Sequence, residues 1–426
     1  MARYDRIARI TPPPRQATFN GWFTLRDLEG REREPELGRR ARLRYLAIRP
    51  LRRLLERGLD GGPSASITQQ VDVVREELSQ LPARDPERER LARYLREIGG
   101  RSAQGLVRAT FDVGQAAEAG GHLYAAEEFY RTGLDTARAR DLDAQVVVGL
   151  RLLGRVLRER EEWEDAMSAL HRSAELANRL GDALEWARST DALVTVLARQ
   201  GRSAEARRTL ESIEMRAARE GSKVLAVARG SRCAMELAHG NLEEALAAGW
   251  DAISLLLPDD EERNGVLLNM AAAFRRLGLH EAAATCYEIV ARWAAWPEHK
   301  AEARMERAVV AAEAGDVQEF LARRRALLES LDRSDRYFTA LLDLGLGRGA
   351  LLAGRHDLAR DHLRDAISAA RDMDADEVLE RSESLLDALE ADESPGDVTR
   401  EWDTPSAPSL AIADRMGRFA EDLVHR

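Results

Sequence analysis

A small residue recurs along the sequence at a nearly constant spacing, and this period constrains the fold more than any other feature. The recurring positions, called markers below, are Ala126, Ala166, Ala206, Ala245, Ala283, Phe320 and Ala359. They lie 40, 40, 39, 38, 37 and 39 residues apart. Five residues before each marker stands a predicted turn position: Gly121, Glu161, Gly201, Gly240, Gly278, Gly315 and Gly354. This period predicts a solenoid of seven helical hairpins, because each hairpin can bury its apolar side only against its neighbours.

Large and small residues fall at helical spacing on both sides of each predicted turn. In the first helices, a large residue followed by glycine precedes the turn at Val113-Gly114, Leu153-Gly154 and Leu346-Gly347. In the second helices, residues four and seven beyond the marker share its face. Examples are Tyr130 and Gly133, Leu170 and Ser173, Tyr287 and Val290, and Leu363 and Ala366. Ala248, three residues beyond its marker, is expected to face outward.

These positions together resemble the tetratricopeptide repeat, from residue 101 to residue 391. The resemblance implies an all-α fold, a right-handed α-solenoid of about seven hairpins whose first helices line a concave groove. The family's usual period is about 34 residues, so the longer repeats here are similar to those of some bacterial peptide-receptor regulators and adaptor proteins. Gly249 in the fourth hairpin and Phe320 and Arg324 in the sixth depart from the pattern, and we expect those two hairpins to pack less regularly.

Residues 1–100 form a basic and irregular region that we expect to cap the array. Pro12-Pro13-Pro14 and the aromatic residues Phe19, Trp22 and Phe23 predict an extended arm. A basic amphipathic helix follows over about 36–57, which Pro50 should kink or divide. Its arginines could meet nucleic acid, an anionic membrane or an acidic protein, but we expect them to form a solvated face that lies on the acidic array. They are Arg39, Arg40, Arg42, Arg44, Arg49, Arg52, Arg53 and Arg57.

Two more helices precede the array, over about 66–80 and 86–98. Asp85 and Pro86 provide an N-cap and a first-turn proline for the second of them. After a last array helix over 376–390, residues 392–408 read as a flexible linker. Ser409 is expected to cap a C-terminal amphipathic helix over 409–426. The apolar face of this helix consists of Ile412, Met416, Phe419, Ala420 and Leu423.

The C-terminal segment has four alternatives. It docks on the first helices of the fifth to seventh hairpins, it caps the last helix at 376–391, it exchanges between two copies of the chain in self-association, or it stays disordered. About 15 residues make a marginal helix alone in water, so burial must stabilise it in the first three cases.

The sequence offers no motif for catalysis, for a cofactor or for a metal. Gly345-Leu346-Gly347-Arg348-Gly349 lies within a predicted helix and follows no strand, so it does not predict a phosphate loop. The histidines are scattered, with His171 and His362 on second helices, and solvated or capping roles are expected for them. Cys233 and Cys286 lie in separate helices and are expected to be buried, in keeping with a reducing compartment. We therefore expect a cytoplasmic protein without enzymatic activity, cofactor or transmembrane segment.

The groove of the resembled family gives the candidate binding residues. Its groove positions correspond here to residues ten and six before each turn. The earlier hairpins then present Phe111, Gln115, Arg151, Arg155, Asp191 and Thr195, and the later ones Leu268, Ala272, Met305, Val309, Leu344 and Arg348. The first set suits an extended acidic peptide and the second an amphipathic helix. The alternative is that these side chains only fill the space between helices.

We accordingly expect a non-catalytic scaffold that binds a protein or peptide segment in its groove. One alternative is a peptide-responsive regulatory protein. Another is an adaptor in which the basic helix meets nucleic acid or a membrane surface, although residues 1–60 combine fifteen arginines with eight acids in a chain of net charge −10. Residues 1–100 show no convincing helix-turn-helix that could serve a regulatory protein as its effector domain. We do not expect nucleic acid to be the partner.

Overall fold

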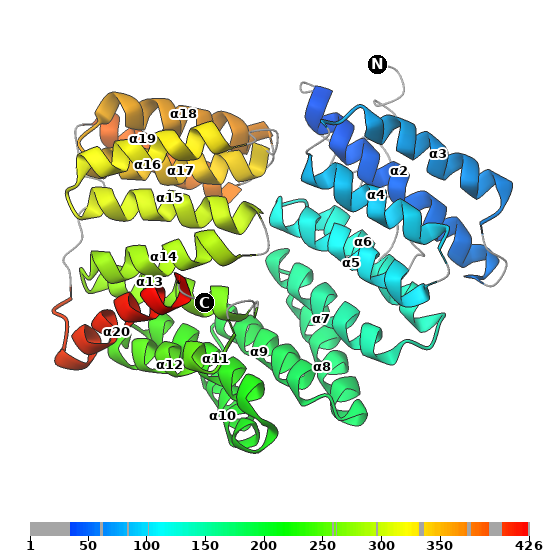
Figure 1. Cartoon of the computed structure of the whole chain (residues 1–426), viewed down its shortest axis with the longest axis horizontal. Helices are drawn as coiled ribbons and strands as arrows, with labels where there is room; N and C mark the ends of the chain where they lie inside the picture. Colours follow the sequence, from blue (N-terminus) through cyan, green and yellow to red (C-terminus); the bar gives the residue numbers. More distant parts are fainter. Residues whose placement is uncertain are drawn as a thin grey trace. The chain divides into compact units, whose positions relative to one another are not determined.

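The computed structural model describes residues 35–424 except 60–62, 83–84, 101, 258–259, 261, 295–296, 332–335, 373–375 and 392–402. Within these ranges the chain forms nineteen helices and no strand, so the all-α prediction is confirmed (Figure 1). The predicted N-terminal arm, with its three prolines and Phe19, Trp22 and Phe23, lies outside the described residues. Most of the predicted linker over 392–408 does so as well.

The chain divides into two compact units, Met1–Val196 and Leu197–Arg426. The N-terminal unit holds α2 (Pro35–Arg57), α3 (Ala65–Ser79), α4 (Pro86–Ile98), α5 (Ala103–Ala119), α6 (Leu123–Arg138), α7 (Asp143–Glu159), α8 (Trp163–Leu180) and most of α9 (Ala183–Arg199). Nothing in the repeat pattern predicted this division, which falls within the first helix of the third hairpin.

The C-terminal unit continues the hairpins and ends with a separate helix. Its helices are α10 (Ser203–Glu220), α11 (Ser222–His239), α12 (Leu242–Ser254), α13 (Glu262–Arg276), α14 (His280–Trp293), α15 (Pro297–Glu313), α16 (Val317–Ser330), α17 (Arg336–Leu352), α18 (His356–Asp372), α19 (Asp376–Glu390) and α20 (Ala407–Val424). Each first helix carries an odd number from α5 to α17, and each second helix the next even number. Neighbouring helices pack in chain order within each unit, which is the solenoid-like arrangement predicted.

All seven predicted turn positions adopt the left-handed backbone conformation. The six glycines there have φ between 64° and 83°, and Glu161 has φ 58°. At Glu161 the backbone N–H bonds to the carbonyl of Arg158 at 3.0 Å, and the next N–H bonds to the carbonyl of Leu157 at 2.9 Å. This pair of hydrogen bonds is the Schellman motif, which closes the last turn of a helix. The recurring glycine therefore serves the backbone of the turn, and Glu161 meets the same requirement without being glycine.

The seven markers are all fully or almost fully buried, at 0–1% exposure. The glycines of the first helices face the second helices, as predicted. A Cβ on Gly114 would stand 2.6 Å from the Tyr130 ring, and one on Gly154 would stand 2.5 Å from Cγ of Leu170. Ala248 is buried at 6% exposure, so its predicted outward orientation is wrong. Three residues advance a helix by about 300°, which leaves Ala248 beside the marker Ala245 on the same face.

The glycine run of α17 serves helix packing, which excludes a phosphate loop at this place. Added Cβ atoms would stand against Met305 at Gly345, against Leu363 at Gly347, and against Phe320 at Gly349. The three glycines thus let helices α15, α18 and α16 approach α17 closely. Phe320, the exception among the markers, is fully buried and fills the space that Gly349 leaves open.

The N-terminal helices α2, α3 and α4 pack around one apolar cluster that also includes residues of α5 and Phe129 of α6. The predicted N-cap of α4 is confirmed, because Asp85 accepts hydrogen bonds from the backbone N–H groups of Glu87 and Arg88. Pro50 lies inside a single helix, α2, and does not divide it in two.

The arginines of α2 pair with acids of the helices that follow. Arg44 binds Glu87 through two hydrogen bonds of 2.6 and 3.1 Å, both side chains being buried. The other two pairs are Arg52 with Asp135 of α6 at 3.0 Å and Arg42 with Glu77 of α3 at 3.4 Å. Arg44 and Arg42 thus bind the neighbouring N-terminal helices α4 and α3, and Arg52 is the arginine of these three that contacts the array.

The C-terminal helix α20 packs on α12 and α14, the second helices of the fourth and fifth hairpins (Figure 1, red). It meets one first helix, α13, at Arg263, but its main contacts are with second helices, so the predicted docking along the first helices of the fifth to seventh hairpins is wrong, and so is the cap on α19. The helix begins earlier than predicted, because Ser406 and not Ser409 caps it. The Oγ of Ser406 accepts from the Ser409 N–H at 3.2 Å, and its carbonyl accepts from the Leu410 N–H at 3.0 Å. Pro408 is tolerated because the first turn of a helix needs no N–H donor.

Cys233 and Cys286 are both free and fully buried, as predicted. They belong to the apolar cluster that includes helices α11 to α14 and the buried side chains of α20. Burial raises the pKa of the Cys233 thiol to about 12, and burial likewise raises that of Cys286.

Candidate functional site

The candidate groove residues divide by burial into two groups. Half-buried are Gln115, Arg151, Arg155, Asp191, Thr195, Leu268, Ala272 and Arg348. Buried are Phe111, Met305, Val309 and Leu344, at 5%, 5%, 0% and 6% exposure. Polar candidates thus reach solvent in part, whereas most apolar candidates do not. The predicted apolar end of the groove is reduced to Leu268 and Ala272.

Phe111 and Met305 fill space between helices, which was the alternative role considered for the candidates. The ring of Phe111 lies against Gly133 of α6 and Gly149 of α7, where an added Cβ would stand 2.5 and 2.8 Å from the ring. Met305 packs on Gly345 of α17 in the same manner. Neither side chain is available to a ligand without rearrangement of the helices that it separates.

Arg155 is held by an acid of the preceding first helix. Its Nε and Nη2 donate to the two carboxylate oxygens of Glu118 on α5, at 2.6 and 2.7 Å. The hydroxyl of Tyr130 donates to the same carboxylate at 2.5 Å. Burial, and then the charge of Glu118, raises the pKa of the Tyr130 hydroxyl well above its ordinary value. Burial opposes the charge on Arg155, but Glu118 outweighs it, so the pKa of the guanidinium is raised.

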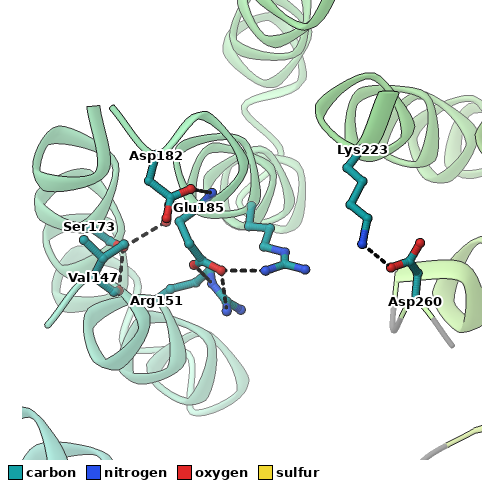
Figure 2. A network of polar contacts seen from close by, with 9 residues as sticks. Val147, Arg151, Ser173, Asp182, Glu185, Lys223 and Asp260 are labelled. Carbon is teal, nitrogen blue, oxygen red and sulfur yellow. Dashed lines mark hydrogen bonds and ion pairs between the residues drawn. The ribbon is translucent and has the colours of Figure 1, made fainter. Parts of the chain in front are cut away.

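Arg151 is paired in the opposite direction, with the next first helix (Figure 2). Its Nε donates to Oε2 of Glu185 on α9 at 2.8 Å, and Arg188 donates to Oε1 of Glu185 at 2.6 Å. Burial acts to raise the pKa of Glu185, but Arg151 and Arg188 outweigh it and the pKa is lowered. Figure 2 also shows Ser173 of α8 donating to the carbonyl of Val147 on α7, at 2.8 Å. Polar contacts therefore join α7 both to α8 and to α9.

The C-terminal unit repeats the same arrangement on its own first helices. Arg275 of α13 binds Glu313 and Glu306 of α15, the latter at 2.5 Å. Arg348 of α17 approaches the same Glu306 at 3.3 Å. The carboxylate of Glu306 thus lies between arginines of two neighbouring first helices. Here too burial opposes the charge on Arg275, and Glu313 and Glu306 outweigh it to raise its pKa.

These contacts form what we call the arginine–glutamate ladder: Glu118–Arg155, Arg151–Glu185, Arg275–Glu313, Arg275–Glu306 and Glu306–Arg348. The paired residues are 37, 34, 38, 31 and 42 positions apart, close to one repeat period. Sequence reasoning identified Arg151, Arg155 and Arg348 but missed Arg275 and all of the acids. A search for opposite charges one period apart would have found them. The ladder leaves these candidate arginines already neutralised before any ligand binds.

A buried polar contact also corrects the expectation for His362. Its Nδ1 lies 2.8 Å from Oδ1 of Asp343, and both side chains are buried, so this histidine is neither solvated nor a cap. Arg324 donates from Nε to its Nε2 at 2.7 Å. Among the described residues, no group of three or more histidine, cysteine or acidic side chains could hold a metal ion. No helix in the described ranges has the length and apolar character needed to cross a membrane.

The structure thus defines a class, an all-α array of consecutive helical hairpins with a solenoid-like order of packing. No protein-family model matches the sequence, and no curated protein shows significant sequence similarity to it.

Proposed function

We propose that this chain is a non-catalytic scaffold of the tetratricopeptide-repeat type that binds a peptide or protein segment across its first helices. The observation that supports this most is the set of half-buried side chains ten and six residues before the turns. Gln115, Arg155, Asp191 and Thr195 belong to it in the N-terminal unit. Side chains that recur at one register can read consecutive parts of an extended ligand, as repeat arrays do on their binding surfaces.

The ladder changes the chemistry expected of that ligand. Nε and Nη2 of Arg151 and Arg155 already donate to Glu185 and Glu118. An acidic side chain would have to displace one of these carboxylates, so a run of acids fits poorly. Backbone carbonyls and neutral polar side chains can accept from the remaining guanidinium N–H groups without breaking a pair. We therefore propose an extended polar segment as ligand in place of an acidic peptide. The buried free thiols fit a reducing compartment, and the proposal takes the chain to act in the cytoplasm.

Position-specific photo-crosslinking tests this proposal. A photoreactive amino acid would replace Gln115 or Thr195 on the first helices, or Glu175, an exposed residue on the second helix α8, as the matched control. We expect one discrete partner to be cross-linked from both first-helix positions in the native host and not from the control position. Cross-links from position 175 alone, or none from positions 115 and 195, would overturn the assignment of the first helices as the binding face.

A further inference from the structure

Helix α20 covers a surface of the C-terminal unit that is formed mainly by the second helices α12 and α14, together with residues of the first helix α13. Ile412, Met416 and Leu423 are buried, and they join an apolar cluster with residues of α12, α13 and α14. Phe419 meets Trp250 of α12 edge to face, with ring centroids 5.9 Å apart. The backbone N–H of Asp403 donates to the carbonyl of Arg276 at 3.0 Å. Helix α20 therefore occupies a surface that accepts an amphipathic helix.

Beneath α20 lies a buried arginine whose guanidinium forms no hydrogen bond with any residue in the described ranges. Arg263, at the start of α13, is 1% exposed, and its Nε, Nη1 and Nη2 are all unsatisfied. Its Cζ stands 5.1 Å from the ring centroid of Phe419. Asp260 is close enough to favour the charge, but burial outweighs it, and the pKa of Arg263 is lowered. Phe419 of α20 is thus the partner that the structure gives to this charge.

An aromatic ring satisfies a buried guanidinium only in part. A cation–π contact contributes roughly 0.5–2 kcal/mol, whereas a buried polar group without a hydrogen bond costs about 1–3 kcal/mol and a charged one more. A carboxylate in place of the ring would form charge-assisted hydrogen bonds, which are about twice as strong as neutral ones. The surface under α20 is therefore better matched to an acidic helix than to α20 itself.

We propose that the surface formed by α12, α13 and α14 is a binding site for an amphipathic helix of a partner protein, which places a carboxylate against Arg263. Helix α20 is the internal occupant of this site and must leave before the partner binds. A second copy of the chain would bring the same Phe419 and leave Arg263 equally unpaired. Charge complementarity to Arg263 thus favours a different protein with an aspartate or glutamate at the position of Phe419.

Because α20 belongs to the same chain as its site, a partner helix must compete with an intramolecular contact. A helix that is covalently joined to its site can act at an effective concentration in the millimolar range. A free helix with equal contacts would not displace it at cellular concentrations. Pairing with Arg263 gives a partner helix an advantage that α20 lacks, so the site distinguishes acidic helices from apolar ones.

The first experiment measures the advantage within the intact chain. Phe419→Glu and Phe419→Gln remove the same ring and differ only in charge. We expect amide hydrogens of residues 409–423 to exchange about tenfold more slowly in the glutamate variant than in the glutamine variant. The difference should disappear when Arg263→Met is added to both. Equal exchange in the two variants overturns the proposal, and so does a difference that persists without Arg263.

The second experiment asks whether the site accepts a helix from outside. Met416→Asp places a charge at a fully buried position of α20 and should release it from the otherwise intact chain. The probes are fluorescent peptides with the sequence of residues 403–424 that carry Phe419→Glu or Phe419→Gln. We expect the glutamate peptide to bind the Met416→Asp chain about tenfold more tightly, and both to bind the unsubstituted chain weakly. A folded Met416→Asp chain that binds neither peptide overturns the proposal.

These measurements are independent of the proposed binding face on the first helices. Arg263→Met should leave the cross-links from positions 115 and 195 unchanged, because both lie in the N-terminal unit. If the cross-links from positions 115 and 195 are absent but the difference between Phe419→Glu and Phe419→Gln still depends on Arg263, the scaffold proposal fails and the helix site stands. The reverse result would remove only the helix site.

Discussion

Arg324 of α16 donates a hydrogen bond from Nε to Nε2 of His362, on the second helix of the next hairpin, at 2.7 Å. An arginine can only donate, so Nε2 of His362 accepts and its Nδ1 carries the proton. That proton points to Oδ1 of Asp343, 2.8 Å away on α17. A neutral histidine therefore links a cation and an anion from two other helices. This contact accounts for Arg324, which departs from the repeat pattern of the other second helices.

Removing His362 should destabilise the C-terminal unit. His362→Leu deprives the buried Asp343 carboxylate and the Arg324 guanidinium of one hydrogen bond each, and we expect a loss of about 1–3 kcal/mol in the free energy of unfolding. His362→Asn, which keeps a donor near Nδ1, should lose less. Urea denaturation measures both. His171→Leu, at an exposed position of α8, is the control; an equal effect there would contradict the role given to His362.

Glu161→Gly should stabilise the N-terminal unit. Glu161 holds a φ of 58° that favours glycine, and relief of this conformation should raise the free energy of unfolding by about 1 kcal/mol. The reciprocal control is Gly201→Ala in the next turn. A Cβ there meets nothing within 4 Å, so any loss reflects only its φ of 74°. Thermal unfolding of both variants should show shifts of opposite sign, and shifts of the same sign would refute the shared turn geometry.

Ala206→Trp should destabilise the array far more than Ala204→Trp, two residues earlier on α10. Ala206 is 1% exposed, and overpacking of such a position costs about 1–3 kcal/mol. Ala204 is exposed, and surface changes usually alter stability by less than about 0.5 kcal/mol. Ala248 cannot serve as the exposed control because it is buried. Equal melting temperatures for the two α10 variants would show that the register of this helix is wrong.

Reversal of Arg155 should reduce stability, contrary to the expectation for an exposed groove residue. Arg155→Glu sets two carboxylates against each other at Glu118 and removes two charge-assisted hydrogen bonds, which corresponds to a loss of about 1–3 kcal/mol. The double variant Glu118→Arg with Arg155→Glu restores opposite charges and should regain at least half of the loss. Chemical denaturation of the parent, the two single variants and the double variant gives a double-mutant cycle for this pair. Additive effects would mean that the pair contributes nothing to stability.

Glu185 should contribute stability that depends on pH. Its pKa in the folded chain is lowered, with Arg151 and Arg188 outweighing burial. A carboxylate of this kind stabilises the fold above its unfolded pKa of about 4.3, and the contribution is lost as the pH falls through the folded value. Glu185→Gln should thus be less stable than the parent near neutral pH, and the two should converge only when the pH falls below the lowered pKa of Glu185 in the folded chain. A difference that is constant with pH would contradict this account. Glu164→Gln, at an exposed position, is the control.

The repeat pattern predicted what the local backbone and the close packing of adjacent helices require. The turn glycines reflect the left-handed conformation at each turn, and Gly114 and Gly154 reflect the approach of Tyr130 and Leu170. These requirements recur from hairpin to hairpin, so the same sequence signal occurs several times in one chain and can be recognised without other sequences. Contacts made once, such as that between Phe419 and Arg263, have no such repetition and could not be found in this way.

The candidate site was predicted only in its outline. Counting residues back from each turn located the candidate positions on the first helices. The position of a residue on a helix does not say which other side chain contacts it. The sequence does not predict the partner of Arg155, because Glu118 lies 37 residues away. It predicts that Phe111 faces a groove, because the space that the ring fills is created by the absent side chains of Gly133 and Gly149. Both outcomes depend on pairs of distant residues, which periodicity alone does not specify.

The two cysteines provide a built-in chemical probe for the opening of the C-terminal unit. Both are buried in the cluster that includes α20, and they are the two cysteines of the whole sequence. A thiolate is the reactive form, so a buried thiol with a raised pKa reacts slowly with an alkylating reagent until its surroundings separate. The rate of labelling thus counts openings of the C-terminal unit. The N-terminal unit contains no cysteine, so labelling follows the opening of the C-terminal unit alone and needs no engineered residue.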